Sequence, residues 1–375
     1  MTKTQRAVAL LGALLLVATC APATAQEQPA TKPATPKPTA PAKASTEIMV
    51  GFWNIENLFD YEDDKSNPGD DEFLPSNGWT KERYGRKLAH LAEIIAELDC
   101  HFLGFSEVEN QRVLTDLIQQ KALAKLGYSV AHLDTPDKRG IDLAAIYRAP
   151  VKLADGDKSI RLHPIPIDPP TRGVFEVKAE VAGQPFTVLV NHWPSRRGGS
   201  AKSRPLRQKA AETTKRVTRV AIDAARDHSA DVIVLGDFND DPFDESVRYH
   251  LGAIRNSHAV KNRTDKRGPY RLYNPTWLFF GKPGMGTLYY NREWTWNLFD
   301  QIIVSRGLLD DVGLQLVANS IDIYAPDKMR DHYRRPIRFR KQRNGKDWTE
   351  GYSDHLPIRA KFRVMAKEAP KKKSL

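Results

Sequence analysis

The chain has 375 residues, a formal charge of +11, 41% hydrophobic residues and two cysteines. A chain of this length can bury a large core without cross-links, and two cysteines exclude a fold held together by several disulfide bonds. The excess of Lys and Arg favours a polyanionic partner.

The N-terminus has the features of a secretory signal peptide in the usual order. Basic residues precede an apolar run over residues 7–18, and small residues follow up to Ala25. We therefore expect cleavage after residues 1–25 and export to the periplasm or the extracellular medium. The apolar run is too short to span a bilayer, so no stable membrane insertion of the mature chain is expected. Lipoprotein anchoring at Cys20 is the alternative, although Thr19 fits that motif poorly.

The remaining chain divides by composition into three parts. Residues 26–46 are rich in Pro, Ala, Thr and Lys and predict an extended linker. Residues 47–366 contain neither a second linker nor a repeat and predict one domain, although their number would also allow two. Residues 367–375 form a basic tail. Cys100 follows an apolar helical pattern, so we expect a buried thiol rather than a reactive one.

The first part of the domain alternates between apolar strands and helices. Strands are predicted over residues 47–53 and 101–106, and helices over residues 81–98 and 113–126. This alternation indicates sheets covered by helices. An acidic loop over residues 60–72 could hold an auxiliary Ca²⁺ ion, but its spacing fits no regular calcium loop, and we expect a solvated loop.

Further strand patterns follow, over residues 139–148, 171–177, 185–191, 232–235, 298–305 and 358–364. The first three of these strands follow one another without a helix, which suggests antiparallel pairing. A long amphipathic helix is predicted over residues 205–227, and it leads into the strand that begins at Val232.

Polar residues recur where the apolar strands end. Gly236 stops the strand from Val232, and Asp237 and Asn239 follow two residues apart, on the same side of an extended backbone. These residue types are also typical of a turn. Because the ends of neighbouring strands can converge on one cleft, we expect the following residues to form a site: Asn54, Glu107, Asp142, His192, Asp237, Asn239, Asp300, Asp354 and His355.

The residue types of this set indicate a chemistry. Carboxylates and amides form a hard-oxygen site that suits Mg²⁺ or Mn²⁺ better than structural zinc. Histidines beside acids can transfer protons near neutral pH. Arg172, Arg196 and Arg197 could bind phosphate oxygens. Together these features suggest hydrolysis of a phosphate ester.

The order of the motifs resembles that of the endonuclease/exonuclease/phosphatase superfamily, the deoxyribonuclease I-like proteins. The resemblance spans nearly all of residues 48–364, and each motif is short although the ordered set is specific. Its motifs are Trp-Asn-Ile-Glu-Asn from Trp53, Ser-Glu-Val-Glu from Ser106, Asn191-His192, Gly-Asp-Phe-Asn from Gly236, Asp300 and Ser-Asp-His from Ser353. The resemblance implies an α/β (α+β) fold, a four-layer sandwich of two mixed, mostly antiparallel β-sheets flanked by helices.

The resemblance also implies how the metal and the water are held. Glu107 would be the main metal ligand, with Asn54 and Asp354 close to the ion. His355 would orient or activate the attacking water, and Asp300 would brace it. A histidine held by an acid is what proton transfer in hydrolysis requires.

Other residues would act on the phosphate and the leaving group. By the same resemblance, Asp237 and Asn239 would align the nucleophile and stabilise the pentacovalent phosphate. His192, partnered by Asp142, would assist protonation of the leaving group, and Arg172 would contact a phosphate.

The substrate is less constrained, because this fold serves nucleic acids, inositol phosphates, sphingomyelin and other esters. The basic charge, a Lys/Arg-rich run over residues 328–346 and the aromatic residues Tyr289, Tyr290, Trp294 and Trp296 favour DNA, with RNA as a second polynucleotide. The basic run could instead be a solvated face, and the aromatic side chains could be core. The alternatives are a phosphoesterase for a lipid headgroup or small ester, and a non-catalytic polyanion-binding module. We expect a monomer.

Overall fold

The computed structural model describes residues 46–365 except residues 66, 226–228, 263–269, 343, 344 and 346. The expected signal peptide, nearly all of the expected linker and the basic tail lie outside these described residues. Among the helices described, none is long and apolar enough to cross a membrane.

The first sheet is centred on strand β1 (Glu47–Leu58), which is apolar on both faces. Its strand order is β15-β19-β1-β2-β4-β3, with β16 beside β19. The β1–β2 pair is parallel and the other pairs are antiparallel. The other strands are β2 (Phe102–Val108), β3 (Ser129–His132), β4 (Asp142–Tyr147), β15 (Leu314–Leu316), β16 (Asp322–Ile323) and β19 (Ile358–Val364).

The second sheet has the order β10-β11-β14-β9-β8-β7-β5, with β6 beside β7. The β8–β9 and β10–β11 pairs are parallel and the others antiparallel. The β7–β8 pair confirms the antiparallel pairing predicted for consecutive strands. The strand predicted over residues 139–148 is β4 of the first sheet, so its predicted pairing with the next strand is wrong. Its strands are β5 (Val151–Leu153), β6 (Ile160–His163), β7 (Val174–Val181), β8 (Gln184–His192), β9 (Val232–Asp237), β10 (Ala253–Ile254), β11 (Leu272–Tyr273) and β14 (Asp300–Val304).

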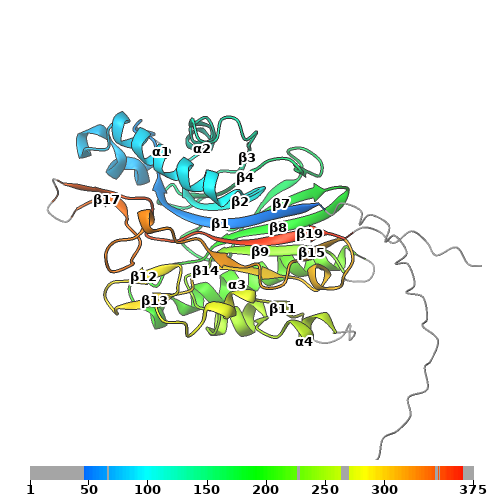
Figure 1. Ribbon diagram of the computed structural model, residues 1–375. Coiled ribbons are helices and arrows are strands. Elements are labelled where there is room, and N and C mark those ends of the chain that lie inside the picture. Colours follow the sequence, from blue (N-terminus) through cyan, green and yellow to red (C-terminus); the bar gives the residue numbers. More distant parts are fainter. Residues whose placement is uncertain are drawn as a thin grey trace, which may run out of the picture. The chain divides into compact units, whose positions relative to one another are not determined.

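The two sheets pack face to face, and helices cover their outer faces (Figure 1). Gly104 of β2 lies so close to Val190 and Leu235 of the second sheet that an added Cβ atom would approach Leu235 to 2.9 Å. Helices α1 (Lys81–Leu98) and α2 (Gln111–Ile118) lie over the first sheet, and α3 (Ser200–Asp223) and the short α4 (Ser257–Lys261) lie over the second. The four-layer sandwich is therefore confirmed.

Shorter elements complete the fold. Two hairpins were not predicted, and they are formed by β12 (Leu288–Tyr290) with β13 (Thr295–Asn297) and by β17 (Phe339–Lys341) with β18 (Trp348–Glu350). A π-helical turn covers Ser246–Leu251. Single 3₁₀ turns cover Pro68–Phe73, Pro75–Asn77, Pro275–Phe279, Gly307–Leu309 and Asp327–Met329.

Three predicted elements differ at their ends. Strand β1 runs to Leu58 rather than residue 53, with an irregularity after Asn54. Helix α2 ends at Ile118 rather than residue 126. Helix α3 starts before Pro205, because the buried Arg207 donates to the first turn and pairs with Asp240 at 2.7 Å.

Gly236 lies where β9 opens toward the polar residues that follow it. Its φ is +149°, and a Cβ atom there would lie 2.1 Å from the backbone oxygen of Asn191 on β8. A side chain therefore has neither an allowed conformation nor space.

We expect Gly236→Ala to lower the free energy of unfolding by about 3 kcal/mol or more, through backbone strain and overpacking. Gly85→Ala is the matched control, because Gly85 lies within α1 and a Cβ there meets nothing within 4 Å. The control should raise stability by about 0.5–1 kcal/mol. Urea unfolding measures both, and similar small effects for the two variants would contradict this account of the strand end.

Candidate active site

The register of the second sheet brings three predicted residues side by side. His192 of β8 lies opposite Asp237 of β9, and Asp237 lies opposite Asp300 of β14. The first sheet contributes Asn54 from β1 and Glu107 from β2. The two sheets thus deliver their polar strand ends to one place.

The carboxylate of Asp237 lies at the centre of this group. Its Oδ2 atom accepts from Asn54 Nδ2 at 3.1 Å and lies 3.6 Å from His192 Nε2 and 3.8 Å from His355 Nε2. Its Oδ1 atom accepts from the backbone N–H of Asn239 at 2.9 Å. Burial raises the pKa of Asp237 to about 7, with Asp300 adding to the rise and His355 opposing it. Asn239 has a φ of +49°, so the prediction of an extended backbone after Asp237 is wrong.

His355 is fixed by the acid that the sequence predicted. Its Nδ1 atom lies 2.7 Å from Asp300 Oδ2, and its backbone N–H donates to Ser353 Oγ at 3.0 Å. Burial disfavours the charged ring, but Asp300 and Asp237 outweigh it and hold the pKa of His355 well above its ordinary value. Because Nδ1 of His355 contacts Asp300, Nε2 is the ring nitrogen that faces Asp237 at the centre of the site. The other oxygen of Asp300, Oδ1, is buried and has no hydrogen-bond partner among the described residues.

His192 does not have the partner that was predicted. Asp142 instead contacts His132 Nε2 at 2.8 Å and accepts from the backbone N–H of Thr135, also at 2.8 Å. His132 lies on the edge strand β3, which pairs with β4. The sequence analysis did not predict this strand. His192 Nδ1 is buried, and no residue in the described part of the chain forms a hydrogen bond with it.

The pKa values of the two histidines are shifted in opposite directions. Burial, with help from the nearby Arg172 and Arg139, holds the pKa of His192 well below its ordinary value. The directions of the two shifts place a proton on His355 rather than on His192. The family resemblance instead implied that His192 assists protonation of the leaving group, a role that requires a protonated ring.

Glu107 points into the site because its backbone is left-handed, with a φ of +65°. Its Oε2 atom accepts from the backbone N–H of Asn57 at 3.1 Å. Its Oε1 atom lies 3.7 Å from Arg139 Nη2 and 3.9 Å from His192 Nε2. Arg139 is a site residue that sequence reasoning missed, although it directly precedes the turn into β4.

Asp354 belongs to a second charged group beside the first. The guanidinium of Arg338 pairs with Asp354 through Nη2 at 2.9 Å and with the buried Glu56 through Nε. Buried Lys87 donates to the backbone oxygen of Glu56. Burial raises the pKa of Glu56 to about 7, and Asp354 adds to that rise, while burial lowers the pKa of Lys87 to about 8. Sequence reasoning also missed Glu56, which lies two residues after Asn54 in the strand-end motif.

Two of the three predicted phosphate-binding arginines are occupied by protein groups. Arg172 is buried, pairs with Asp137 at 2.7 Å and donates to two backbone oxygens that follow β8. Arg196 reaches three aspartates, and its shortest contact is 2.7 Å to Asp244. These arginines hold loops, which corrects the prediction that they bind substrate. Arg197 is exposed, and its binding of a phosphate stays a prediction.

The donor set of the site fits a hard divalent cation. Arg338 contacts both Glu56 and Asp354, and Glu107 accepts from the backbone N–H of Asn57, the residue after Glu56, so the three carboxylates are neighbours. Carboxylate oxygens are the ligands that Mg²⁺ and Mn²⁺ take. A bound divalent cation would polarise a phosphate oxygen and stabilise the charge that develops during hydrolysis.

Acidic side chains also lie close together in the core of the site and outside it. Within the described part of the chain, the groups whose ligand atoms lie within 4.8 Å of one another are Asp237 with Asp300 and His355, and His132 with Asp134 and Asp142. In the acidic loop, Asp60 and Asp70 are buried and accept from local backbone N–H groups. Residues 62–65, 71 and 72 are exposed, so the prediction of a solvated loop holds for most of its length.

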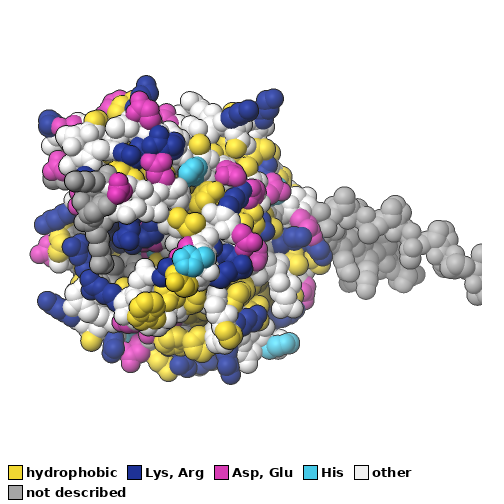
Figure 2. Space-filling model, turned by 60° about the vertical axis from the view of Figure 1, so that its left-hand side comes forward, with side chains coloured by type: hydrophobic (Ala, Val, Ile, Leu, Met, Phe, Trp, Pro, Cys, Tyr) yellow, Lys and Arg dark blue, Asp and Glu magenta, His cyan; other side chains and the backbone are white. Residues whose placement is uncertain are grey.

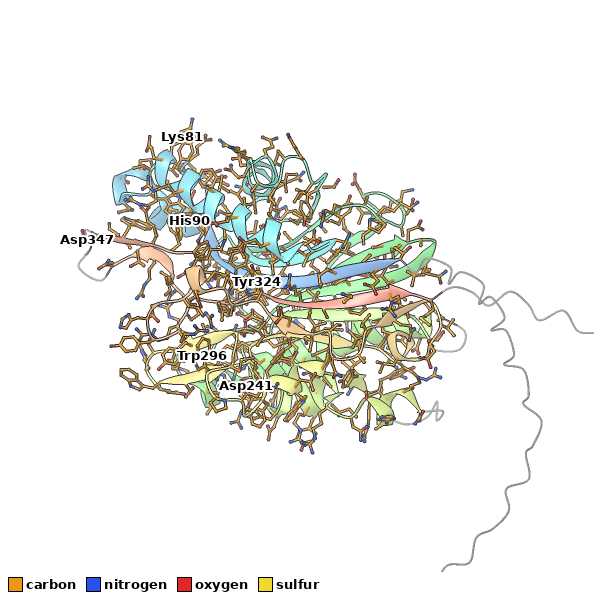
Figure 3. All side chains as sticks on the ribbon, viewed as in Figure 1. Lys81, His90, Asp241, Trp296, Tyr324 and Asp347 are labelled. Atoms are coloured by element: carbon orange, nitrogen blue, oxygen red, sulfur yellow. The ribbon has the colours of Figure 1, made fainter. Side chains whose placement is uncertain are left out.

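The face that carries the hairpins is hollowed, and Lys, Arg, Asp and Glu side chains line the hollow (Figure 2). Hydrophobic side chains gather along its lower rim. Asp241 accepts from Leu298 N–H at 2.7 Å and from Asn297 Nδ2 at 3.0 Å, so it ties the foot of the β12–β13 hairpin to the loop after β9. Figure 3 labels Asp241 together with Trp296 of β13, on the same side of the molecule.

A buried His–Asp pair beside clustered carboxylates is the arrangement of a metal-dependent phosphoester hydrolase. Residues 49–364 match the model of the Endonuclease/Exonuclease/phosphatase family, and the chain belongs to that family. The enzymes of this family hydrolyse phosphate esters with a divalent metal ion, and this chain is such an enzyme.

Solved structures share the fold at low sequence identity. The human Nocturnin catalytic domain with bound sulfate anion is 20% identical, with coverage of 85% of this chain and 95% of that chain and a TM-score of 0.51. Truncated Caenorhabditis elegans TDP2 is 16% identical, with coverage of 85% and 98% and a TM-score of 0.50. A mannosyl-6-phosphatase of Bacteroides thetaiotaomicron is 15% identical, with coverage of 84% and 99% and a TM-score of 0.51. A comparison with curated proteins gave no match.

Asp300→Asn tests the brace on His355. Loss of the carboxylate removes the charge that favours the protonated ring, so the pKa of His355 should fall, as measured by NMR titration of the ring protons. We expect turnover of a phosphodiester to fall about 100-fold or more with little change in stability. Asp322→Asn on β16 is the control, and equal behaviour of the two variants would contradict the assigned role.

Proposed function

We propose that this protein is an exported, divalent-metal-dependent nuclease that hydrolyses phosphodiester bonds of DNA, and of RNA as a second substrate, with weak sequence preference. The observation that carries the proposal is the position of the β12–β13 hairpin. Leu288, the first residue of β12, forms a β-bridge with His355. The hairpin therefore starts beside His355, and we infer that a polymer bound at the site contacts it.

The β12–β13 hairpin and the segment before β17 present aromatic side chains to solvent. Trp294 is 76% exposed, Tyr290 is 39% exposed and Tyr333 is 65% exposed. The guanidinium of Arg335 lies 4.6 Å from the ring centre of Tyr333 and 5.7 Å from that of Tyr289. Exposed aromatic rings with an arginine are surfaces on which unpaired bases stack. Of the predicted aromatic residues, Trp296 packs partly against the core instead.

The basic run contributes less than the sequence suggested. Lys328 pairs with two glutamates of α1, Arg330 and Arg334 pair with Asp327, and Arg335 pairs with Asp331. Arg343 and Lys346 lie outside the described residues. The proposal of a polynucleotide substrate therefore draws on the aromatic surface and the net charge more than on a continuous basic groove.

A small phosphate ester is the second candidate substrate, and one observation favours it. A pocket of about 360 Å³ adjoins the charged group, and its lining includes Glu56, Asn57, Arg338 and Trp348. A pocket of this size is large enough for a sugar phosphate. The structural neighbour described as a mannosyl-6-phosphatase acts on a substrate of that kind.

A nicking assay tests the proposed activity. Residues 26–375 should nick supercoiled plasmid with Mg²⁺ or Mn²⁺, and EDTA should abolish the nicking. Glu107→Ala and His355→Ala should each reduce it about 100-fold or more without unfolding the protein, because they remove a metal ligand and a proton-transfer group. Hydrolysis of a small phosphodiester without any nicking would contradict the nuclease and favour the small ester.

Trp294→Ala tests the aromatic surface separately from the chemistry. Loss of one stacked base should raise KM for single-stranded DNA about tenfold, because base–aromatic stacking contributes about 1–3 kcal/mol. Turnover of bis(4-nitrophenyl) phosphate should not change, because that ester is too small to reach the hairpin tip. Val312→Ala is the control, since Val312 is also exposed but lies before β15. An unchanged KM for DNA would contradict stacking at Trp294.

A further inference from the structure

Two arginines from distant loops contact the carboxylates assigned to the metal. Arg139 Nη2 lies 3.7 Å from Glu107 Oε1 and donates to Asn57 Oδ1 at 2.9 Å. Arg338 Nη2 lies 2.9 Å from Asp354 Oδ2. Each of these two carboxylates therefore has an arginine beside it.

Arg139 is presented by a loop, residues 134–141, that is held in place from several sides. Asp137 accepts from the backbone N–H of Arg139 at 3.0 Å and from buried Arg172 at 2.7 Å. Gly140 has a φ of +61° and packs against Asn67 so closely that no side chain would fit. Arg172 thus acts through this loop rather than on a phosphate. The backbone of Arg139 is fixed, whereas its side chain is 50% exposed and can reorient.

Arg338 comes from the opposite side of the site, directly before β17. Glu56, which it also contacts, is buried and accepts a second hydrogen bond from the backbone N–H of Phe339 at 2.9 Å. Glu56 therefore keeps a partner when the guanidinium of Arg338 moves. Lys87 stays beside the same carboxylates as a fixed buried charge.

Charge balance explains why the arginines are there. Glu56 and Asp354 share Arg338 as a partner, and Glu107 lies beside Arg139, so each carboxylate has a cation next to it. Repulsion between neighbouring carboxylates is costly unless cations neutralise them. A divalent cation competes with the two guanidinium groups for the same oxygens. Arginines displaced from carboxylates would remain next to the site, and a guanidinium binds phosphate oxygens in the same geometry as carboxylate oxygens.

We propose that Arg139 and Arg338 are exchangeable counter-ions: they neutralise Glu107 and Asp354 in the metal-free protein and transfer to the substrate phosphate when a divalent cation takes these carboxylates. The proposal rests on metal-dependent phosphoester hydrolysis at this site and holds for either substrate class. It couples metal binding to substrate binding through this chain's own residues.

The proposal predicts that loss of an arginine strengthens the binding of the metal ion and weakens the binding of the substrate phosphate. Removal of either arginine frees a carboxylate for the metal and takes a contact away from the phosphate. If an arginine had a purely structural role, its removal would weaken the binding of both ligands or of neither. Arg139→Gln is the first variant, because the side chain is half exposed and the fold should tolerate the change. Arg338→Lys is the second, because a single ammonium keeps the charge but cannot bridge Glu56 and Asp354 as the guanidinium does.

The test measures Mn²⁺ affinity by isothermal titration calorimetry and KM for bis(4-nitrophenyl) phosphate at saturating Mn²⁺. For Arg139→Gln we expect Mn²⁺ to bind at least about fivefold more tightly and KM to rise about tenfold. Arg338→Lys should change both quantities in the same directions. Arg363→Gln is the control, because it breaks an arginine–glutamate contact of 2.5 Å with Glu47, the residue that starts β1. The control should change neither quantity.

The outcomes separate this proposal from the proposed function. Unchanged or weaker Mn²⁺ binding in both variants, with an active wild-type enzyme, overturns the exchange and leaves the function intact. Tighter Mn²⁺ binding with an unchanged KM also overturns it, because the arginines then do not reach the phosphate. A wild-type enzyme that cleaves the small ester but not DNA contradicts the nuclease alone, and the arginine measurements still decide the exchange.

Discussion

The buried carboxylate of Asp237 is the group on which the rest of the site depends. It lies in register between His192 and Asp300, accepts from Asn54 of the other sheet and is within 4 Å of the Nε2 atoms of both site histidines. An acid in this position must be fully surrounded by donors or cations, because burial otherwise neutralises it. The packing of the two sheets supplies those partners: Asn54 comes from β1, His192 from β8, and Asn239 and His355 from the segments after β9 and before β19. The fold therefore buries one acid at the junction where these segments meet.

The same burial separates the two histidines. Both rings are buried and both face Asp237, yet His355 has an acid on its other nitrogen and His192 has none. One ring is therefore stabilised as a cation and the other as a neutral base, a difference that suits an enzyme that must both donate and accept protons. The neighbouring group of Glu56, Glu107 and Asp354 has the complementary arrangement, in which carboxylates depend on Lys87 and two arginines for neutralisation. The proposed proton transfer and the proposed cation binding thus involve adjacent groups of residues, which meet where Glu107 lies 3.9 Å from His192.

The sequence predicted the parts of this molecule that local pattern determines. The apolar strands, the amphipathic helix α1, the burial of Cys100 and the His355–Asp300 contact all follow from periodicity or from an ordered set of short motifs. The errors concern partners that arrive from elsewhere in the fold. Asp142 faces His132 across the sheet edge, Arg172 is taken by Asp137, and the basic run is largely paired with acids of α1 and of its own turns. Lys87 and Arg139 were missed, and Arg338 was placed only in the basic run, because a charged residue in a helix or loop gives no sign in the sequence that it points inward.

The most direct test of the central claim is the anomalous scattering of Mn²⁺ in a crystal of this protein. The account predicts one strong peak within coordination distance of carboxylate oxygens of Glu107 and Asp354, with the guanidinium groups of Arg139 and Arg338 moved away from those oxygens. A peak at His132 and Asp142 instead, or no ordered ion at all at saturating Mn²⁺, would contradict the assignment of the metal site and the catalytic account built on it.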